Sequence, residues 1–182
     1  VRLAIEGGAT LVQYRDKHLP EHSRREQATA LAGLCRDHGV TFLVNDDVEL
    51  ARSSQADGVH LGKDDMDVSD ARRILGQEAI IGVSCYNRWT HAQAAASQGA
   101  DYIAFGSFFP SATKPGAVAA DTELLHRARR ELSLPVAAIG GISADNGASL
   151  VRAGADMLAV VQAVFAATDI RQAAKQLASL YY

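Results

Sequence analysis

The stretch Gly99-Ala100-Asp101-Tyr102 decides the fold, because versions of it recur along the chain. Each version stands between a helix-like run and a strand-like run: Gln55-Ala56-Asp57-Gly58, Gly154-Ala155-Asp156-Met157 and, more loosely, Gly7-Gly8-Ala9-Thr10. Glycine serves the left-handed turn that ends a helix, and aspartate can accept hydrogen bonds from amides in a turn. A repeated helix-to-strand junction predicts a series of βα units.

Strand-like and helix-like runs alternate from one end of the chain to the other. Several strand-like runs are apolar throughout, which is typical of parallel strands covered on both faces. The predicted strands are Leu11–Arg15, Thr41–Asn45, Gly58–Leu61, Ile80–Ser84, Tyr102–Gly106, Val136–Gly140 and Met157–Val161. The predicted helices are Glu21–His38, Val48–Ser54, Val68–Leu75, His91–Gln98, Thr122–Leu132, Ala144–Arg152 and Ile170–Leu180.

The order of these elements predicts an α/β fold of the (β/α)8 TIM-barrel type. Right-handed crossovers leave an open doubly wound sheet or a closed barrel, and a helix after every strand favours the barrel. Residues Val1–Glu6 resemble the end of a helix whose strand is absent. Because a barrel without that strand would have open edges, we expect residues 1–182 to be a single barrel domain that lacks its first strand.

The composition is that of one globular domain without a strongly charged surface. The 182 residues are 48% hydrophobic, which suits one domain with a sizeable core. A net charge of −3 indicates neither a nucleic-acid nor a membrane surface, and the sequence contains no signal-peptide pattern or membrane span. Cys35 and Cys85 have no metal-ligand spacing, so we expect buried thiols and a cytoplasmic location. A homo-oligomer remains possible.

Three polar residues with a spacing of two follow the first apolar run. In an extended strand, Gln13, Arg15 and Lys17 project from one face. A solvated surface explains such a pattern equally simply, but a strand of an α/β unit is covered by helices. We therefore predict an anion site at the carboxyl end of this strand.

Carboxylates follow the next two predicted strands, as Asn45-Asp46-Asp47 and as Asp64-Asp65. The carboxyl ends of barrel strands meet at one face, where barrel active sites lie. Hard oxygen ligands from two points suit Mg²⁺ that keeps several waters. We predict Asp46 and Asp65 as the metal ligands and assign Asp47 and Asp64 to helix capping or solvent. Helix capping is also the alternative for the whole set.

Two further segments are typical of phosphate binding. Gly140-Gly141-Ile142 precedes a helix, and many barrels bind phosphate after their last two strands. The long loop 107–121 contains Ser111, Thr113 and Lys114, which suits a phosphate clamp or lid, although an exposed polar loop would look similar. His60, within Val-His-Leu, is predicted to be a core histidine with one hydrogen bond.

These motifs, taken in order, resemble the thiamine phosphate synthase family. They are Gln-x-Arg-x-Lys, Asn-Asp, Gly-Val-His-Leu-Gly-x-x-Asp, Gly-Val-Ser, a Thr-Lys loop and Ile-Gly-Gly-Ile, and the resemblance extends from Glu6 to Phe165. It implies a (β/α)8 barrel that joins a pyrimidine diphosphate to a thiazole phosphate, giving thiamine phosphate and diphosphate with Mg²⁺ as cofactor.

The resemblance also implies residue roles. The pyrimidine diphosphate would be held by Gln13, Arg15, Lys17, Asn45, Ser84 and Lys114. The thiazole phosphate would be held by Ser111, Thr113, Gly141, Val161 and Gln162. Arg15, Lys17, Lys114 and Ser84 would act in catalysis, and Asp46 and Asp65 would bind Mg²⁺. The family usually has glutamine at Lys63, threonine at Ser111 and serine at Gln162.

The implied reaction is a dissociative substitution. Cations neutralise the departing diphosphate, the aminopyrimidine ring delocalises the resulting cation, and the thiazole nitrogen attacks. Three alternatives remain. A thiazole tautomerase of the same fold would have a histidine near Ser84-Cys85-Tyr86-Asn87. A ligand-binding or sensor barrel would have lost its charged site residues, and a phosphosugar isomerase would have little use for two acidic clusters.

Overall fold

The computed structural model describes residues 1–110 and 118–182, which form a seven-stranded parallel sheet. The strands lie in sequence order and pair only in parallel. They are β1 (Leu11–Tyr14), β2 (Thr41–Asn45), β3 (Gly58–Leu61), β4 (Ile80–Tyr86), β5 (Tyr102–Phe105), β6 (Val136–Ile139) and β7 (Met157–Ala159). This order confirms the predicted α/β series of parallel strands.

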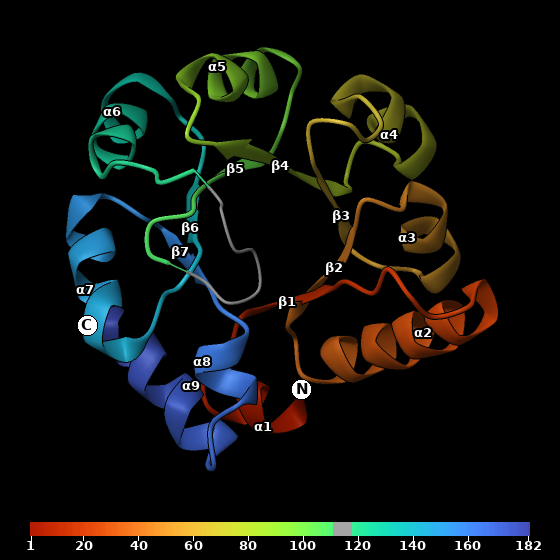
Figure 1. Ribbon diagram of the computed structural model, residues 1–182. Coiled ribbons are helices and arrows are strands. Elements are labelled where there is room, and N and C mark those ends of the chain that lie inside the picture. Colours follow the sequence, from red (N-terminus) through yellow and green to blue (C-terminus); the bar gives the residue numbers. More distant parts are fainter. Residues whose placement is uncertain (111–117) are drawn as a thin grey trace.

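Helices surround the sheet in a ring (Figure 1). They are α1 (Arg2–Glu6), α2 (Glu21–Asp37), α3 (Val48–Ser54), α4 (Val68–Leu75), α5 (Trp89–Ser97), α6 (Glu123–Glu131), α7 (Ala144–Ala153), α8 (Gln162–Phe165) and α9 (Ile170–Ala178), followed by the 3₁₀ turn η1 (Ser179–Tyr181). The predicted elements are confirmed to within a few residues at their ends. The short helix α8 was not predicted.

The sheet has a core on each of its faces. Toward the helices, alternate strand residues such as Phe42, Ile81 and Phe105 are fully buried. On the enclosed inner face, a separate cluster contains Leu43 and Tyr102 together with small residues. This explains why the strands are apolar on both faces, as parallel strands covered on both sides must be.

The strands β1 and β7 are the two edges of the described sheet. The helix α1 precedes β1 and packs against α9, with an ion pair between Glu6 and Arg171. The observed architecture is therefore a curved parallel sheet of the barrel type. Seven parallel strands with two open edges agree with the expected barrel without its first strand, but a full (β/α)8 barrel is not shown.

The recurring aspartate joins neighbouring strands at the amino-terminal edge of the sheet. The Asp57 carboxylate accepts a hydrogen bond from the Phe42 amide at 2.7 Å, and Asp101 accepts one from the Ile81 amide at 2.7 Å. Asp156 accepts one from Val136 at 2.8 Å. Each carboxylate therefore binds the preceding strand in the sheet, whereas the sequence led us to expect turn amides.

Candidate active site

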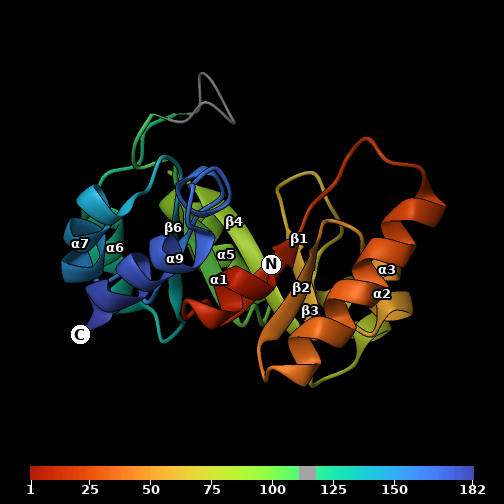
Figure 2. The same ribbon diagram turned by 90° about the horizontal axis from the view of Figure 1, so that it is seen from below.

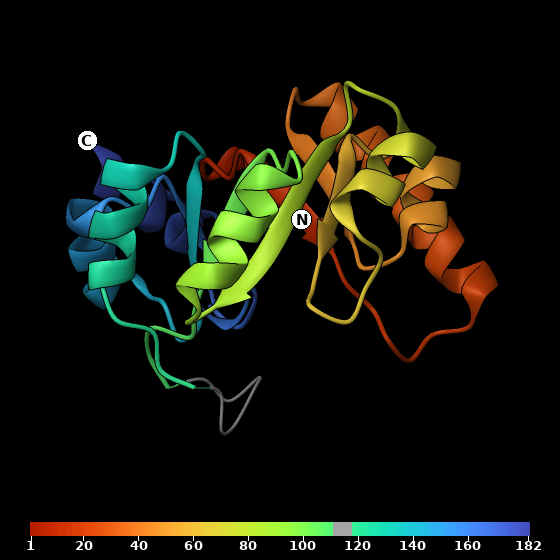
Figure 3. The same cartoon turned by 90° about the horizontal axis from the view of Figure 1, so that it is seen from above.

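The predicted anion and metal residues meet at the carboxyl-terminal edge of the sheet. This edge is uppermost in Figure 2 and lowermost in Figure 3, where the loops after β1 and β3 extend from it. The Lys17 ammonium lies 3.0 Å from the Asp46 carboxylate. Arg15 is exposed and makes no ion pair within the described parts of the chain, although its charge helps to ionise Asp46. The structure thus brings residues after three different strands into one cluster.

The backbone around both carboxylates is fixed by local hydrogen bonds. Asp46 has a φ of 63°, a left-handed conformation that is uncommon for a residue with a side chain. Its amide donates to the His60 carbonyl at 2.8 Å. The Gly62 amide donates to the Asp65 carboxylate at 2.7 Å, and a Cβ on Gly62 would lie 2.8 Å from that carboxylate. Glycine at 62 therefore lets Asp65 fold back toward the sheet.

A side-chain hydrogen bond joins the two carboxyl groups. Burial opposes the charge on Asp46, but hydrogen bonds from Asp65 and Lys17 outweigh it and lower the pKa of Asp46. Burial, followed by the hydrogen bond to Asp46, raises the pKa of Asp65. Two like charges in contact disfavour each other's ionisation, and a bound cation would relieve this by favouring the ionised form of both carboxyl groups.

A divalent cation would need further ligands at this pair. Within residues 1–110 and 118–182, no group of three or more His, Cys, Asp or Glu side chains is arranged to hold a metal. Mg²⁺ commonly takes only one or two carboxylates and completes its octahedron with water and substrate phosphate. The donor set of Asp46 and Asp65 fits Mg²⁺ on those terms.

The neighbouring aspartates have the structural roles predicted for them. Asp47 caps α3 by accepting from the Leu50 amide at 2.9 Å, and it also pairs with Arg24 at 3.0 Å. Asp64 is exposed and lies 3.6 Å from Lys63. Both assignments are confirmed, because neither side chain joins the Asp46–Asp65 pair. The pairing of Asp47 with Arg24 on α2 was not foreseen.

Ser84 and Asn45 flank a buried histidine. Asn45 of β2 and His60 of β3 are paired in register, and His60 Nε2 lies 2.8 Å from the Ser84 hydroxyl oxygen. His60 Nδ1 lies 2.7 Å from the Tyr102 hydroxyl. The prediction of a single hydrogen bond for His60 was wrong, and Tyr102 was missed. A polar residue facing inward from an apolar strand was the available signal.

The residues expected to hold the second phosphate lie after β6 and β7. Gly140 and Gly141 have φ values of 95° and 63°, and a Cβ on Gly141 would lie 2.3 Å from the Pro110 carbonyl oxygen. Val161 is exposed and precedes Gln162, the first residue of α8. Among residues 1–110 and 118–182, no hydrogen bond or ion pair joins these residues to the Asp46–Asp65 pair. Ser111, Thr113 and Lys114 fall outside the described residues.

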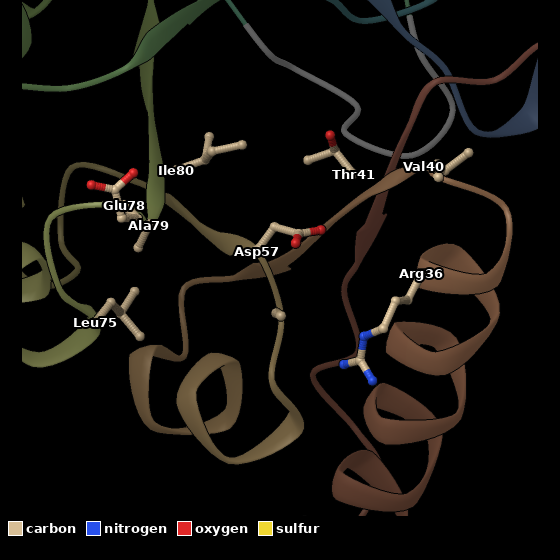
Figure 4. Close-up of a pocket in the computed structure, with 10 residues that line it drawn as sticks. Arg36, Val40, Thr41, Asp57, Leu75, Glu78, Ala79 and Ile80 are labelled. Carbon is tan, nitrogen blue, oxygen red and sulfur yellow. The ribbon is translucent and has the colours of Figure 1, made fainter.

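The opposite edge of the sheet is also hollowed. A cavity of about 560 Å³ lies among the loops that precede β2, β3 and β4, with Arg36, Asp57 and Glu78 on its wall (Figure 4). Asp57 is engaged there with the Phe42 amide. The predicted site residues lie at the other edge, so this cavity is not the candidate active site.

The fold and site together define a class: a parallel α/β protein of the barrel type with cations and paired carboxylates at the carboxyl edge of its strands. Comparisons with known proteins give the particular family. The family model described as "Thiamine monophosphate synthase" matches residues 1–164. The chain therefore belongs to the thiamine monophosphate synthase family, and its activity is that of a transferase of thiamine biosynthesis.

Individual members of this family are similar to the protein over nearly its whole length. It is 54% identical to the thiamine-phosphate synthase of Thiobacillus denitrificans over 181 residues, covering 100% of this chain and 86% of the relative. It is 52% identical to that of Thioalkalivibrio sulfidiphilus, with coverages of 97% and 84%. The solved thiamine phosphate pyrophosphorylase from Pyrococcus furiosus superposes with a TM-score of 0.91 at 38% identity, with coverages of 99% and 86%.

Within the described residues, no helix has both the length and the apolar character needed to cross a membrane.

Proposed function

We propose that the carboxyl-terminal edge of the sheet is the site where a pyrimidine diphosphate and a thiazole phosphate are coupled to thiamine phosphate. The observation that supports this most directly is the Asp46–Asp65 pair with Lys17 beside it. Anionic and cationic side chains gathered at one point suit a substrate that carries both a diphosphate and its counterion.

Arg15 and Lys17 bind the diphosphate as it leaves. Arg15 has no carboxylate partner in an ion pair within the described ranges, and Lys17 has only Asp46. Positive charge already in place where negative charge develops stabilises a transition state without reorganisation. Bond breaking can therefore run ahead of attack by the thiazole nitrogen. Lys114, which lies outside the described residues, is proposed to add a further cation to the diphosphate.

Gln13, Asn45 and Ser84 orient the pyrimidine substrate. All three lie at or near the carboxyl ends of β1, β2 and β4, and rigid strands place side chains more reproducibly than loops do. The thiazole phosphate is held on the other side, where Gly141, Val161 and Gln162 offer backbone amides after β6 and β7. Ser111 and Thr113 would contribute hydroxyl groups to the same substrate.

Mg²⁺ would be held by Asp46 and Asp65, and when bound it supplies charge that stabilises the departing diphosphate. The Asp46 carboxylate itself keeps Lys17 in place through the 3.0 Å ion pair. Binding of the cation would favour the ionised form of both carboxyl groups, since metal ligands must be deprotonated. No general base is required, because no proton is removed from the pyrimidine methylene carbon or from the thiazole nitrogen that attacks it.

We also propose that one further strand between β7 and β1 closes the sheet into a (β/α)8 barrel. The support is the contact of α1 with α9, which brings the first and last helices of the chain together near the two edge strands (Figure 1).

A cytoplasmic location is proposed as well, since Cys35 and Cys85 are both buried and unpaired, as is usual in a reducing compartment.

A coupling assay with site variants tests the proposed site. The purified chain is supplied with both phosphorylated substrates and Mg²⁺, and the product is oxidised to a fluorescent thiochrome. Asp46→Ala and Asp65→Ala should lower turnover at least ~100-fold, with circular dichroism unchanged. Asp64→Ala is the matched control and should retain normal turnover. Near-normal activity in Asp65→Ala would refute the metal assignment.

A further inference from the structure

A chain of polar groups crosses the enclosed inner face of the sheet beneath the proposed site. His60 of β3 stands between two hydroxyl groups, with Nδ1 at 2.7 Å from Tyr102 of β5 and Nε2 at 2.8 Å from Ser84 of β4. His60 and Tyr102 are only 7% and 6% exposed. Buried polar groups have no water to bind, so each of these groups depends on its hydrogen bond to the neighbouring side chain.

Gly82 leaves the space through which the Tyr102 side chain reaches His60. The sheet register aligns His60 with Gly82, and Gly82 with Tyr102, so the three residues lie at one level of the sheet. A Cβ on Gly82 would lie 2.0 Å from Cζ of Tyr102. The aromatic ring of Tyr102 therefore passes over β4 to reach His60, and only glycine leaves room for it.

The positions of the protons in this series of hydrogen bonds depend on the partner of Tyr102. Burial raises the pKa of Tyr102, and a hydrogen bond with the Gln13 side chain partly opposes this. A group that favours the phenolate acts as a donor, and a Tyr102 oxygen that accepts from the Gln13 amide would leave its own hydrogen for His60 Nδ1. A neutral imidazole with Nδ1 as acceptor carries its hydrogen on Nε2, and Nε2–H faces the Ser84 oxygen.

We propose that Tyr102 and His60 are positioning residues that fix the Ser84 hydroxyl as a hydrogen-bond donor toward the substrate. With its oxygen already accepting from His60, Ser84 has its own hydrogen to offer at the carboxyl edge. The matching acceptor is a ring nitrogen of an aminopyrimidine. This inference rests on the proposed function, which assigns Ser84 to the pyrimidine substrate.

The first test measures the tautomer of His60 and needs no activity. Nitrogen NMR of ¹⁵N-histidine-labelled protein, with the His60 signal assigned through His60→Gln, distinguishes Nε2–H from Nδ1–H imidazole. We expect the Nε2–H form in the unmodified protein and a shift away from it in Tyr102→Phe, which keeps the ring over Gly82. An Nδ1–H or doubly protonated ring in the unmodified protein overturns the proposal, as does an unchanged tautomer in Tyr102→Phe.

The second test separates positioning from a merely structural role. Tyr102→Phe should raise the KM for the pyrimidine diphosphate roughly 5- to 10-fold, and leave the KM for the thiazole phosphate unchanged. In a Ser84→Ala background the same substitution should have no further effect, because the group that it positions is gone. An equal loss in both backgrounds overturns the proposal.

A matched control removes a different buried phenol hydroxyl. Tyr14 on the outer face of β1 donates to Gln27 at 3.1 Å, away from the chain through His60. Tyr14→Phe should leave both KM values unchanged. If Ser84→Ala itself leaves the KM for the pyrimidine diphosphate unchanged, the substrate role proposed for Ser84 fails. The NMR result still decides, independently, whether the hydrogen-bond chain exists.

Discussion

The two edges of the sheet use aspartate in opposite ways. At the amino-terminal edge, Asp57, Asp101 and Asp156 each accept from the amide of the neighbouring strand. At the carboxyl-terminal edge, burial and contact with Asp46 raise the pKa of Asp65, and Asp46 has a left-handed backbone. In the first arrangement each carboxylate accepts a hydrogen bond from a strand amide, whereas in the second two acidic side chains contact each other. The first stabilises the sheet, and the second costs stability where a ligand is to bind.

The amino-terminal arrangement also shows how the sheet is assembled. The aspartates join β3 to β2, β5 to β4 and β7 to β6. At each of these joints the same residue donates its own amide to the partner strand, as Asp156 does to the Val136 carbonyl at 2.9 Å. The strands are therefore clamped in pairs. Barrel enzymes commonly separate stability and catalysis in this way between the two ends of their strands.

The largest effect is expected on catalysis from a cation at the carboxyl edge. Arg15→Ala should lower kcat/KM by about 10²–10³, because it removes a charge that meets the leaving diphosphate. The melting temperature should change little, since Arg15 makes no ion pair among the described residues. Arg25→Ala, which removes an exposed helical pair with Glu21, is the control. A marked loss of stability in Arg15→Ala would contradict the view that the carboxyl-terminal edge serves catalysis and not stability.

The next effect concerns stability at the amino-terminal side of the sheet. A Cβ on Gly58 would lie 1.8 Å from the Ile80 carbonyl oxygen, a backbone atom that cannot move alone. Gly58→Ala should therefore cost roughly 3 kcal/mol or more and lower the melting temperature by about 6–12 °C. Gly33 in α2 has nothing within 4 Å, so Gly33→Ala should raise the melting temperature slightly. Equal melting temperatures for the two variants would contradict this packing.

A smaller loss is expected when one strand clamp is removed. Asp156→Ala deletes the acceptor of the Val136 amide and should cost about 1 kcal/mol, or about 2–4 °C in melting temperature. Activity at room temperature should remain. Asp37→Ala removes an exposed carboxylate at the end of α2 and serves as the control in the same thermal scan. A loss of activity from Asp156→Ala at a temperature where the variant is folded would contradict the claim that the amino-terminal edge serves stability alone.

The smallest effect has the opposite sign. Asp65→Asn removes the repulsion with Asp46 while keeping an acceptor for the Gly62 amide. Without Mg²⁺ the melting temperature at neutral pH should rise by roughly 2 °C, which is about 0.5–1 kcal/mol after allowance for solvent screening. Asp64→Asn should leave it unchanged. A lower melting temperature in Asp65→Asn would show that the pair stabilises the folded chain.

Local sequence patterns predicted the strands and most of the helices, because strand and helix periodicities and glycine turns are encoded within a few residues. They also placed Asp46 and Asp65 together, since parallel strands end at one edge. The contacts of His60 with Tyr102 and of Asp101 with Ile81 were not predicted, because they join residues on different strands. The helix α8, Gln162–Phe165, is one turn long and leaves no periodic signal.

The most direct test is a calorimetric titration of inorganic diphosphate in the presence of Mg²⁺ into the unmodified chain, Asp65→Asn and Asp64→Asn. We expect the unmodified chain and Asp64→Asn to bind with equal affinity, and Asp65→Asn to lose at least ~100-fold. That result would establish the Asp46–Asp65 pair as part of a magnesium-diphosphate site. Equal affinity in all three proteins would contradict it.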